Sequence, residues 1–214
     1  MDGHVWLAYF VAAWLIALSP GSGAVLSMSH GLAYGVRQTS ATIAGLQLGL
    51  AFILLVAGVG VGAILVASAT AFTVVKLLGA AYLAWLGVKQ WRAPLTADVD
   101  AAGEGVAAAG LSVGQRVLRG ALTNATNPKG IVFMVAVLPQ FIDPQRPLAP
   151  QLLILLATTL AVDTVVMHGY AWLAARLRRW LRSARARRAR NRVFGGVLMG
   201  MGASLLMVGR AAKA

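Results

Sequence analysis

Long apolar runs separated by short polar connections make up most of the chain. The six runs span residues 5–28, 41–66, 71–91, 120–142, 148–175 and 193–209. A helix that crosses a bilayer needs about 20 mostly apolar residues, and most of the runs supply them. The pattern therefore predicts an all-α integral membrane protein with six transmembrane helices.

The first run is preceded by Asp2, Gly3 and His4, none of which is a lysine or an arginine. A cleavable signal peptide begins with a positively charged region. We therefore expect the mature protein to keep this helix.

The connection between the third and fourth runs is rich in Ala and Gly and holds three of the six acids in the chain. It has too few large apolar residues to form a core of its own. We predict a flexible cytoplasmic loop over residues 93–115, which divides a single membrane domain into two three-helix repeats, 1–92 and 116–214. Ser112 and Gln115 have the spacing of a helix capping box, which predicts a helix that begins there with Arg116 and Arg119 at the membrane surface.

The composition excludes several classes of protein. Hydrophobic residues make up 59% of the chain and charged residues 12%, and the mean hydropathy is +0.76. Soluble domains usually contain about 25% charged residues, so an ordinary soluble globule is excluded. The absence of cysteine removes disulfides, cysteine-ligated metals and thiol nucleophiles. Three scattered histidines do not form a metal cluster, and we expect no cofactor.

The net charge of +13 is concentrated in one segment, because nine arginines lie between residues 176 and 192. This segment fits either a nucleic-acid patch or a cytoplasmic loop between two spans. The apolar runs on both sides favour the loop, since cytoplasmic loops collect basic residues. We predict no nucleic-acid partner and a loop that lies on anionic lipid headgroups, at about 1 kcal/mol per basic residue.

The orientation follows from the same rule. With the N-terminus outside the cell, the cytoplasmic side holds 14 of the 19 basic residues and the outer side holds 4. The distribution predicts that both termini lie outside.

Glycine pairs with the spacing G-x-x-x-G occur in several runs: Gly31/Gly35, Gly45/Gly49, Gly58/Gly62 and Gly196/Gly200. Small residues at this spacing let helix backbones approach closely in lipid. We interpret the pairs as packing positions and leave the oligomeric state open.

Two apolar runs are interrupted at corresponding places, the first at Ser19, Pro20 and Gly21 and the fourth at Asn127, Pro128 and Lys129. Each break opens a three-helix half, so the two halves enter the membrane from opposite sides. Interrupted helices at matching positions of inverted repeats indicate the binding site of a transporter. A simple proline kink is the alternative for either break alone.

Lys129 and Asp163 are ionisable residues near the middle of the fourth and fifth runs, where isolated charges cost at least about 2.5–3.5 kcal/mol. Lys129 suits a carboxylate, and Asp163 suits an ammonium group or a transported proton. Gln47, Asn124 and Asn127 supply neutral hydrogen bonds. The alternative is a buried Lys–Asp pair that only fixes helix packing.

These residues resemble motifs of the lysine-exporter superfamily, in its threonine/homoserine-efflux branch. The matching segments are Leu18–Gly21, Leu78–Leu83 with Leu86 and Gly87, Asn127–Lys129, and Val162 with Asp163. The resemblance implies a multi-pass permease of the bacterial inner membrane that exports amino acids or close derivatives by proton antiport. The superfamily usually has Pro-Gly-Pro where this chain has Pro20, Gly21 and Ser22, which leaves a more flexible break.

Two other functions stay open at this point. One is a divalent-cation exporter of the same superfamily, which the small number of acids and histidines disfavours. The other is an intramembrane serine protease with Ser22 and His168 as its dyad, which needs both side chains within hydrogen-bond reach. The sequence does not distinguish threonine, homoserine, homoserine lactone, branched-chain and basic amino acids as substrates.

Overall fold

The computed structural model describes residues 1–67, 69–92, 110–176, 192 and 199, and this part of the chain contains helices and no strands. The sixth predicted run, except residue 199, and nearly all of the arginine-rich segment lie outside the described residues. The helices are α1 (Gly3–Leu18), α2 (Ser22–Ala67), α3 (Ala69–Trp91), α5 (Val113–Ala125), α6 (Pro128–Ala136), the 3-10 helix η1 (Leu138–Phe141) and α7 (Leu148–Arg176).

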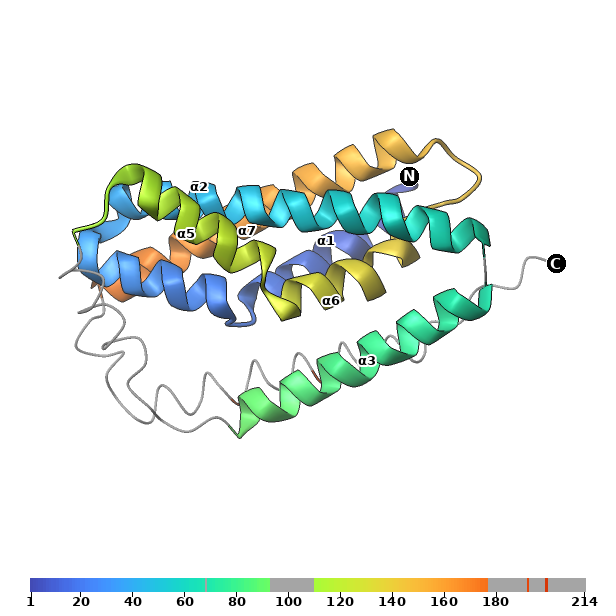
Figure 1. Ribbon diagram of the computed structural model, residues 1–214, viewed down its shortest axis with the longest axis horizontal. Coiled ribbons are helices and arrows are strands. Elements are labelled where there is room, and N and C mark those ends of the chain that lie inside the picture. Colours follow the sequence, from blue (N-terminus) through green and yellow to red (C-terminus); the bar gives the residue numbers. More distant parts are fainter. Residues whose placement is uncertain (68, 93–109, 177–191, 193–198, 200–214) are drawn as a thin grey trace.

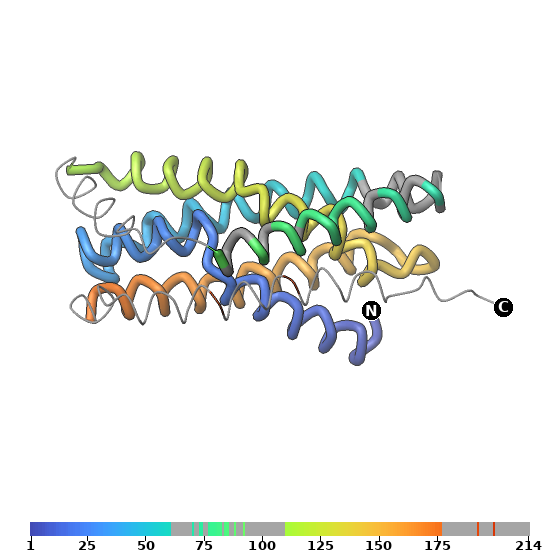
Figure 2. Tube along the Cα trace, turned by 90° about the horizontal axis from the view of Figure 1, so that it is seen from below, coloured from blue at the N-terminus to red at the C-terminus, as the bar shows by residue number. Residues whose placement is uncertain are grey.

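The helices run roughly along the long axis of the molecule (Figures 1 and 2). α1 ends in the middle of the molecule, and the chain continues in the same general direction as the start of α2. Gly35 then reverses the chain with a φ of 74° and a ψ of 169°, so α2 consists of two helical segments. The first predicted run therefore extends past residue 28 to this turn, and the expectation that Gly35 packs against another helix is wrong. A positive φ favours glycine at the turn.

α5 and α6 form a second broken pass, interrupted at Thr126 and Asn127. The helix predicted to begin at Ser112 is α5, which starts at Val113, ahead of the apolar run 120–142, because Ser112 caps it. The backbone N–H of Gln115 donates to Ser112 Oγ at 3.3 Å, and that of Ser112 donates to Gln115 Oε1 at 2.9 Å. The predicted capping box is confirmed. Predicted runs 71–91 and 148–175 match α3 and α7 to within two residues.

α2 is the central helix, and it packs mainly against α5 and α7. A methyl group on Gly45 or Gly49 would collide with the backbone of α5 at Val117 or Ala121. Gly120 of α5 lies equally close to the α2 backbone at Thr42. The predicted close packing at Gly45 and Gly49 is confirmed, and glycines on both helices bring α2 and α5 into backbone contact.

Arg116 is buried against neighbouring helices. Its Nη1 donates to Gln38 O at 3.0 Å and to Gln38 Oε1 at 3.3 Å, and its guanidinium lies 5.1 Å from the centre of the Tyr34 ring. The guanidinium points into the protein because it binds the Gln38 carbonyl and stacks on the Tyr34 ring, both close to the turn at Gly35. Arg119 is exposed, as expected.

The buried apolar residues form two clusters. The first lies toward the N-terminus and includes Tyr9, Leu54, Phe133, Leu138 and Leu155. The second lies toward the Gly35 turn and includes Met28, Ile43, Leu46, Met167 and Ala171. Residues of both clusters lie next to the helix breaks, Ile16 in the first and Ala17 and Ala24 in the second.

The outer surface is also apolar. Leu48 and Val59 of α2 and Leu153 of α7 are each more than 60% exposed. Two described helices are long and apolar enough to cross a membrane, Ser22–Gly60 and Leu148–Arg176, and shorter apolar helices span Gly3–Leu18 and Pro128–Phe141. An apolar exterior around these helices is suited to lipid rather than to water.

Candidate functional site

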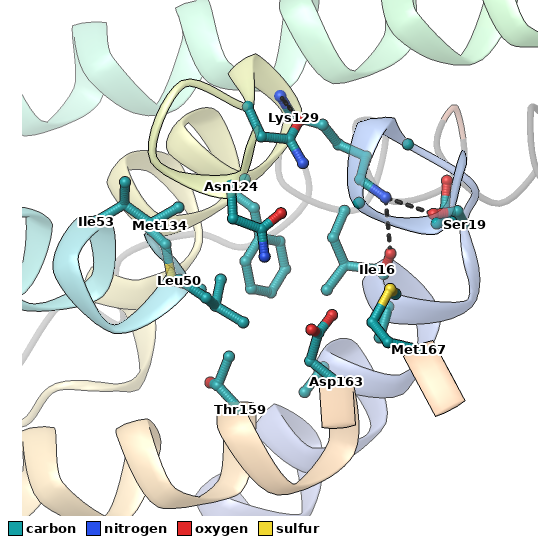
Figure 3. A pocket seen from close by; sticks show the side chains of 18 residues that line it. Ile16, Ser19, Leu50, Ile53, Asn124, Lys129, Met134, Thr159, Asp163 and Met167 are labelled. Carbon is teal, nitrogen blue, oxygen red and sulfur yellow. Dashed lines mark hydrogen bonds between the residues drawn. The ribbon is translucent and has the colours of Figure 1, made fainter. Parts of the chain in front are cut away.

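The two helix breaks meet at one cavity in the middle of the molecule (Figure 3). The cavity has a volume of about 50 Å³, which is room for a few water molecules. Six residues predicted from the sequence line it: Ser19, Gly21, Asn124, Asn127, Lys129 and Asp163. Polar residues more than 100 positions apart in the chain therefore line one cavity.

The first break leaves backbone carbonyls at the end of α1, and side chains from other helices satisfy them. Lys129 Nζ donates to Ile16 O at 3.1 Å and also to Ser19 O through a short contact. Tyr170 of α7 donates its hydroxyl to Leu18 O at 2.6 Å. Carbonyls at a helix end need partners when water is excluded.

The second break is a helix start. Asn127 caps α6, because its Oδ1 accepts a hydrogen bond from the backbone N–H of Lys129 at 3.2 Å. Pro128 follows at the first helical position, where its missing N–H costs nothing. The oxygen of Asn127 therefore already has a partner within the protein.

Pro20 and Pro128 are not among the residues that line the cavity, which corrects their predicted place in it. Pro20 is buried and Pro128 is exposed. Pro20 lies between α1 and α2, and Pro128 begins α6. The residues on either side of each proline line the cavity.

Asp163 points from α7 into the cavity and is held by Gln47 of α2. Gln47 Nε2 donates to Asp163 Oδ2 at 2.8 Å, and Gln47 itself does not line the cavity. The ion pairs of the described residues are both made by Arg146, with Asp2 and Asp143. Lys129 and Asp163 thus face one cavity without forming an ion pair, because the carbonyls of α1 hold the ammonium.

Asn124 and the glycines of the first break connect the two breaks. Asn124 is buried, and its Nδ2 donates to Leu46 O at 2.9 Å. A Cβ on Gly23 would lie 3.0 Å from Asn124 Oδ1, and a Cβ on Gly21 would lie 3.1 Å from Lys129 Cε. The bare backbone at both glycines lets the polar side chains of the second break approach the first.

The apolar wall of the cavity was not predicted from the sequence; it includes Ile16, Leu50, Ile53, Phe133 and Met134. These residues look like ordinary core positions in the sequence. Thr159 was not predicted either, although it lies four residues before Asp163 and therefore on the same face of α7. That spacing was a signal that could have identified Thr159.

His168 does not pair with Ser22. Its Nε2 lies 3.1 Å from Ser40 Oγ, and its Nδ1 lies 2.8 Å from Thr164 O. Both ring nitrogens are occupied, so the proposed protease dyad is wrong. The described residues contain no group of three or more His, Asp or Glu side chains that could hold a metal ion.

The sequence profile of LysE type translocators matches residues 14–209 of this chain. The chain belongs to the LysE type translocator family. The match covers both helix breaks and most of the chain. Because the family consists of translocators, the protein is a membrane transporter. The predicted resemblance to the lysine-exporter superfamily is confirmed.

Several relatives of this translocator align over most of its length. A membrane protein of Vibrio cholerae, described as uncharacterized, is 48% identical over 94% of this chain and 96% of its own. A homoserine/homoserine lactone efflux protein of Salmonella typhi is 44% identical over 94% and 95%. A leucine efflux protein of Klebsiella pneumoniae is 35% identical over 73% and 72%. No solved structure matches this translocator.

The capping role of Asn127 can be separated from a role in binding. We expect Asn127→Ala to lower the free energy of unfolding by about 1 kcal/mol, whereas Asn127→Ser keeps most of it, because serine also caps helices. Unfolding of the purified translocator in detergent measures the difference. Equal losses in the two variants would show that Asn127 does not stabilise the protein by capping α6.

Proposed function

We propose that this translocator exports homoserine or a similar small amino acid, or a close derivative such as the lactone, from the cytoplasm through the cavity at the two helix breaks. The observation that carries the proposal is the meeting of Lys129, Asp163 and two interrupted helices at one cavity. The names of the Salmonella and Klebsiella relatives support an amino acid as the substrate.

The cavity has suitable groups for both ends of an amino acid. The N-termini of α2 and α6 lie beside it, with Gly23, Ala24 and Gly130 among the lining residues. Helix N-termini carry partial positive charge and unpaired N–H groups, which favour a carboxylate. The Asp163 carboxylate favours an ammonium group on the opposite side. The apolar wall of Ile16, Leu50 and Phe133 suits a short side chain.

Transport requires the cavity to open to each side in turn. Its present volume of about 50 Å³ is too small for an amino acid, so the surrounding helices must separate for binding. The two apolar clusters lie on opposite sides of the cavity and would act as the two barriers. We infer that six helices, arranged as two inverted repeats in the bacterial inner membrane, rock around this fixed site.

Asp163 is our candidate for the coupling group of a proton antiport. It is an acid at the site, and its second oxygen is not used by Gln47. The carboxylate would take up a proton from outside the cell as the ammonium group of the substrate leaves. It would release this proton in the cytoplasm once the empty site faces inward. One proton would then enter for each amino acid exported.

We expect proteoliposomes with an acidic interior to accumulate labelled homoserine, because outward proton flow drives uptake of the amino acid. Asp163→Asn should lose the stimulation by the pH gradient and keep exchange of homoserine across the membrane. Asp143→Asn is the matched control, since this carboxylate lies in the connection between η1 and α7, away from the cavity. It should behave as wild type.

Two results would contradict this account. Gradient-driven accumulation by Asp163→Asn would exclude Asp163 as the coupling group. Absence of homoserine, lactone and leucine flux in the wild type, with the protein folded, would refute the proposed substrate class.

The orientation rests on the charges at the two ends of the molecule. Arg37, Arg116, Arg119 and Arg176 lie at the end with the Gly35 turn, the start of α5 and the end of α7. The opposite end carries the N-terminus and the Arg146 ion pairs with Asp2 and Asp143. We infer that the arginine end is cytoplasmic and that the segment 176–192 lies on anionic lipid there.

Single cysteines test this orientation directly, because the chain has none of its own. We expect Gln145→Cys to react with an impermeant thiol reagent in intact cells and Gly114→Cys to react only after lysis. Both positions are exposed, and a side chain at Gly114 meets nothing within 4 Å. The reverse pattern of labelling would place the arginine end outside the cell.

A further inference from the structure

The end of α1 forms a small cation site. The carbonyl oxygens of Ile16 and Ser19 converge on one nitrogen, Lys129 Nζ, at the C-terminal end of the helix (Figure 3). A helix C-terminus carries partial negative charge. Carbonyls at the end of a broken transmembrane helix coordinate cations in transporters.

The cation in this site belongs to the protein itself. Lys129 comes from α6, in the second half of the chain, and its backbone N–H is fixed by Asn127. Gly21 leaves room for the end of the lysine side chain, since a Cβ there would lie 3.1 Å from Lys129 Cε and 3.2 Å from Nζ. The ammonium is therefore held at the carbonyls instead of at Asp163.

This arrangement separates Lys129 from the substrate carboxylate. Two of the three N–H donors of the ammonium are used by the carbonyls of α1. The site at the end of α1 is also where the cationic side chain of a basic amino acid would find backbone oxygens. The ammonium of Lys129 already occupies that place.

We propose that Lys129 excludes substrates with a cationic side chain by filling the carbonyl cation site at the end of α1 with its own ammonium. The specificity part of this inference rests on the proposed function, whereas the cation site itself does not. Lys129→Ala removes three methylene groups and the ammonium, which together correspond in size and charge to n-propylammonium.

The site can be tested by thermal unfolding of the full-length protein in detergent, without any transport. We expect Lys129→Ala to lower the Tm by about 5 °C or more, because it leaves two buried carbonyls without a donor. n-Propylammonium should restore at least half of that loss, whereas tetramethylammonium, which has no N–H donor, should not. Met134→Ala is the matched control: it enlarges the same cavity from the same helix without removing a cation.

The specificity is tested in the same assay with free amino acids. Lysine should raise the Tm of Lys129→Ala, while norleucine, which has a similar apolar chain without the ammonium, should have a much smaller effect. Lysine should leave the Tm of the wild type unchanged. Stabilisation of the wild type by lysine would show that Lys129 does not exclude a cationic side chain.

The cation site would be refuted if n-propylammonium stabilised Met134→Ala as much as Lys129→Ala, or if tetramethylammonium were equally effective. If Lys129→Ala does not fold, Lys129→Met and Lys129→Arg replace it. Methionine keeps most of the apolar stem and arginine keeps the charge and donors. A Tm for Lys129→Met equal to that of the wild type would overturn the proposal, and a higher Tm for Lys129→Arg than for Lys129→Met would support it.

Discussion

Every backbone N–H and C=O inside a membrane protein needs a partner from the protein itself, because lipid offers none. An unbroken helix meets this requirement along its length, and the two breaks in this chain do not. An unsatisfied buried carbonyl costs about 1–3 kcal/mol, so the breaks determine which other groups must come close. Tyr170 and Lys129 supply donors at the end of α1, and Asn127 supplies an acceptor at the start of α6. The polar groups that line the cavity come together because of these requirements.

The same requirement joins the two halves of the protein. The ammonium of one break satisfies the carbonyls of the other, and Asn124 near the second break donates to the backbone of α2. Glycines at both places keep the helices close enough for these contacts. The hydrogen bonds of Lys129 therefore join α6 to the end of α1.

Much of the fold was predictable because a helix that crosses lipid needs a long, mostly apolar segment, which is visible in the sequence. The runs that became α3 and α7 were located to within two residues, and the prolines at positions 20 and 128 marked both breaks. The turn at Gly35 falls in the predicted connection between the first two runs, residues 29–40. The residue at which the chain turns was not predicted, because a glycine in the sequence does not show its φ. The partner of Lys129 was missed for a different reason: backbone carbonyls are present at every residue, so no pattern of side chains indicates which ones are free. The burial of the Arg116 side chain was not predicted, because a sequence does not show that Gln38 and Tyr34 lie within its reach.

The central claim is that the two breaks form one binding site for an amino acid. The most direct measurement is an experimental structure of the protein with homoserine bound. The account predicts density for the ligand between Gly21, Asn124 and Asp163, with its ammonium group at the carboxylate. Homoserine bound elsewhere, with the space between the two breaks filled by side chains, would contradict it.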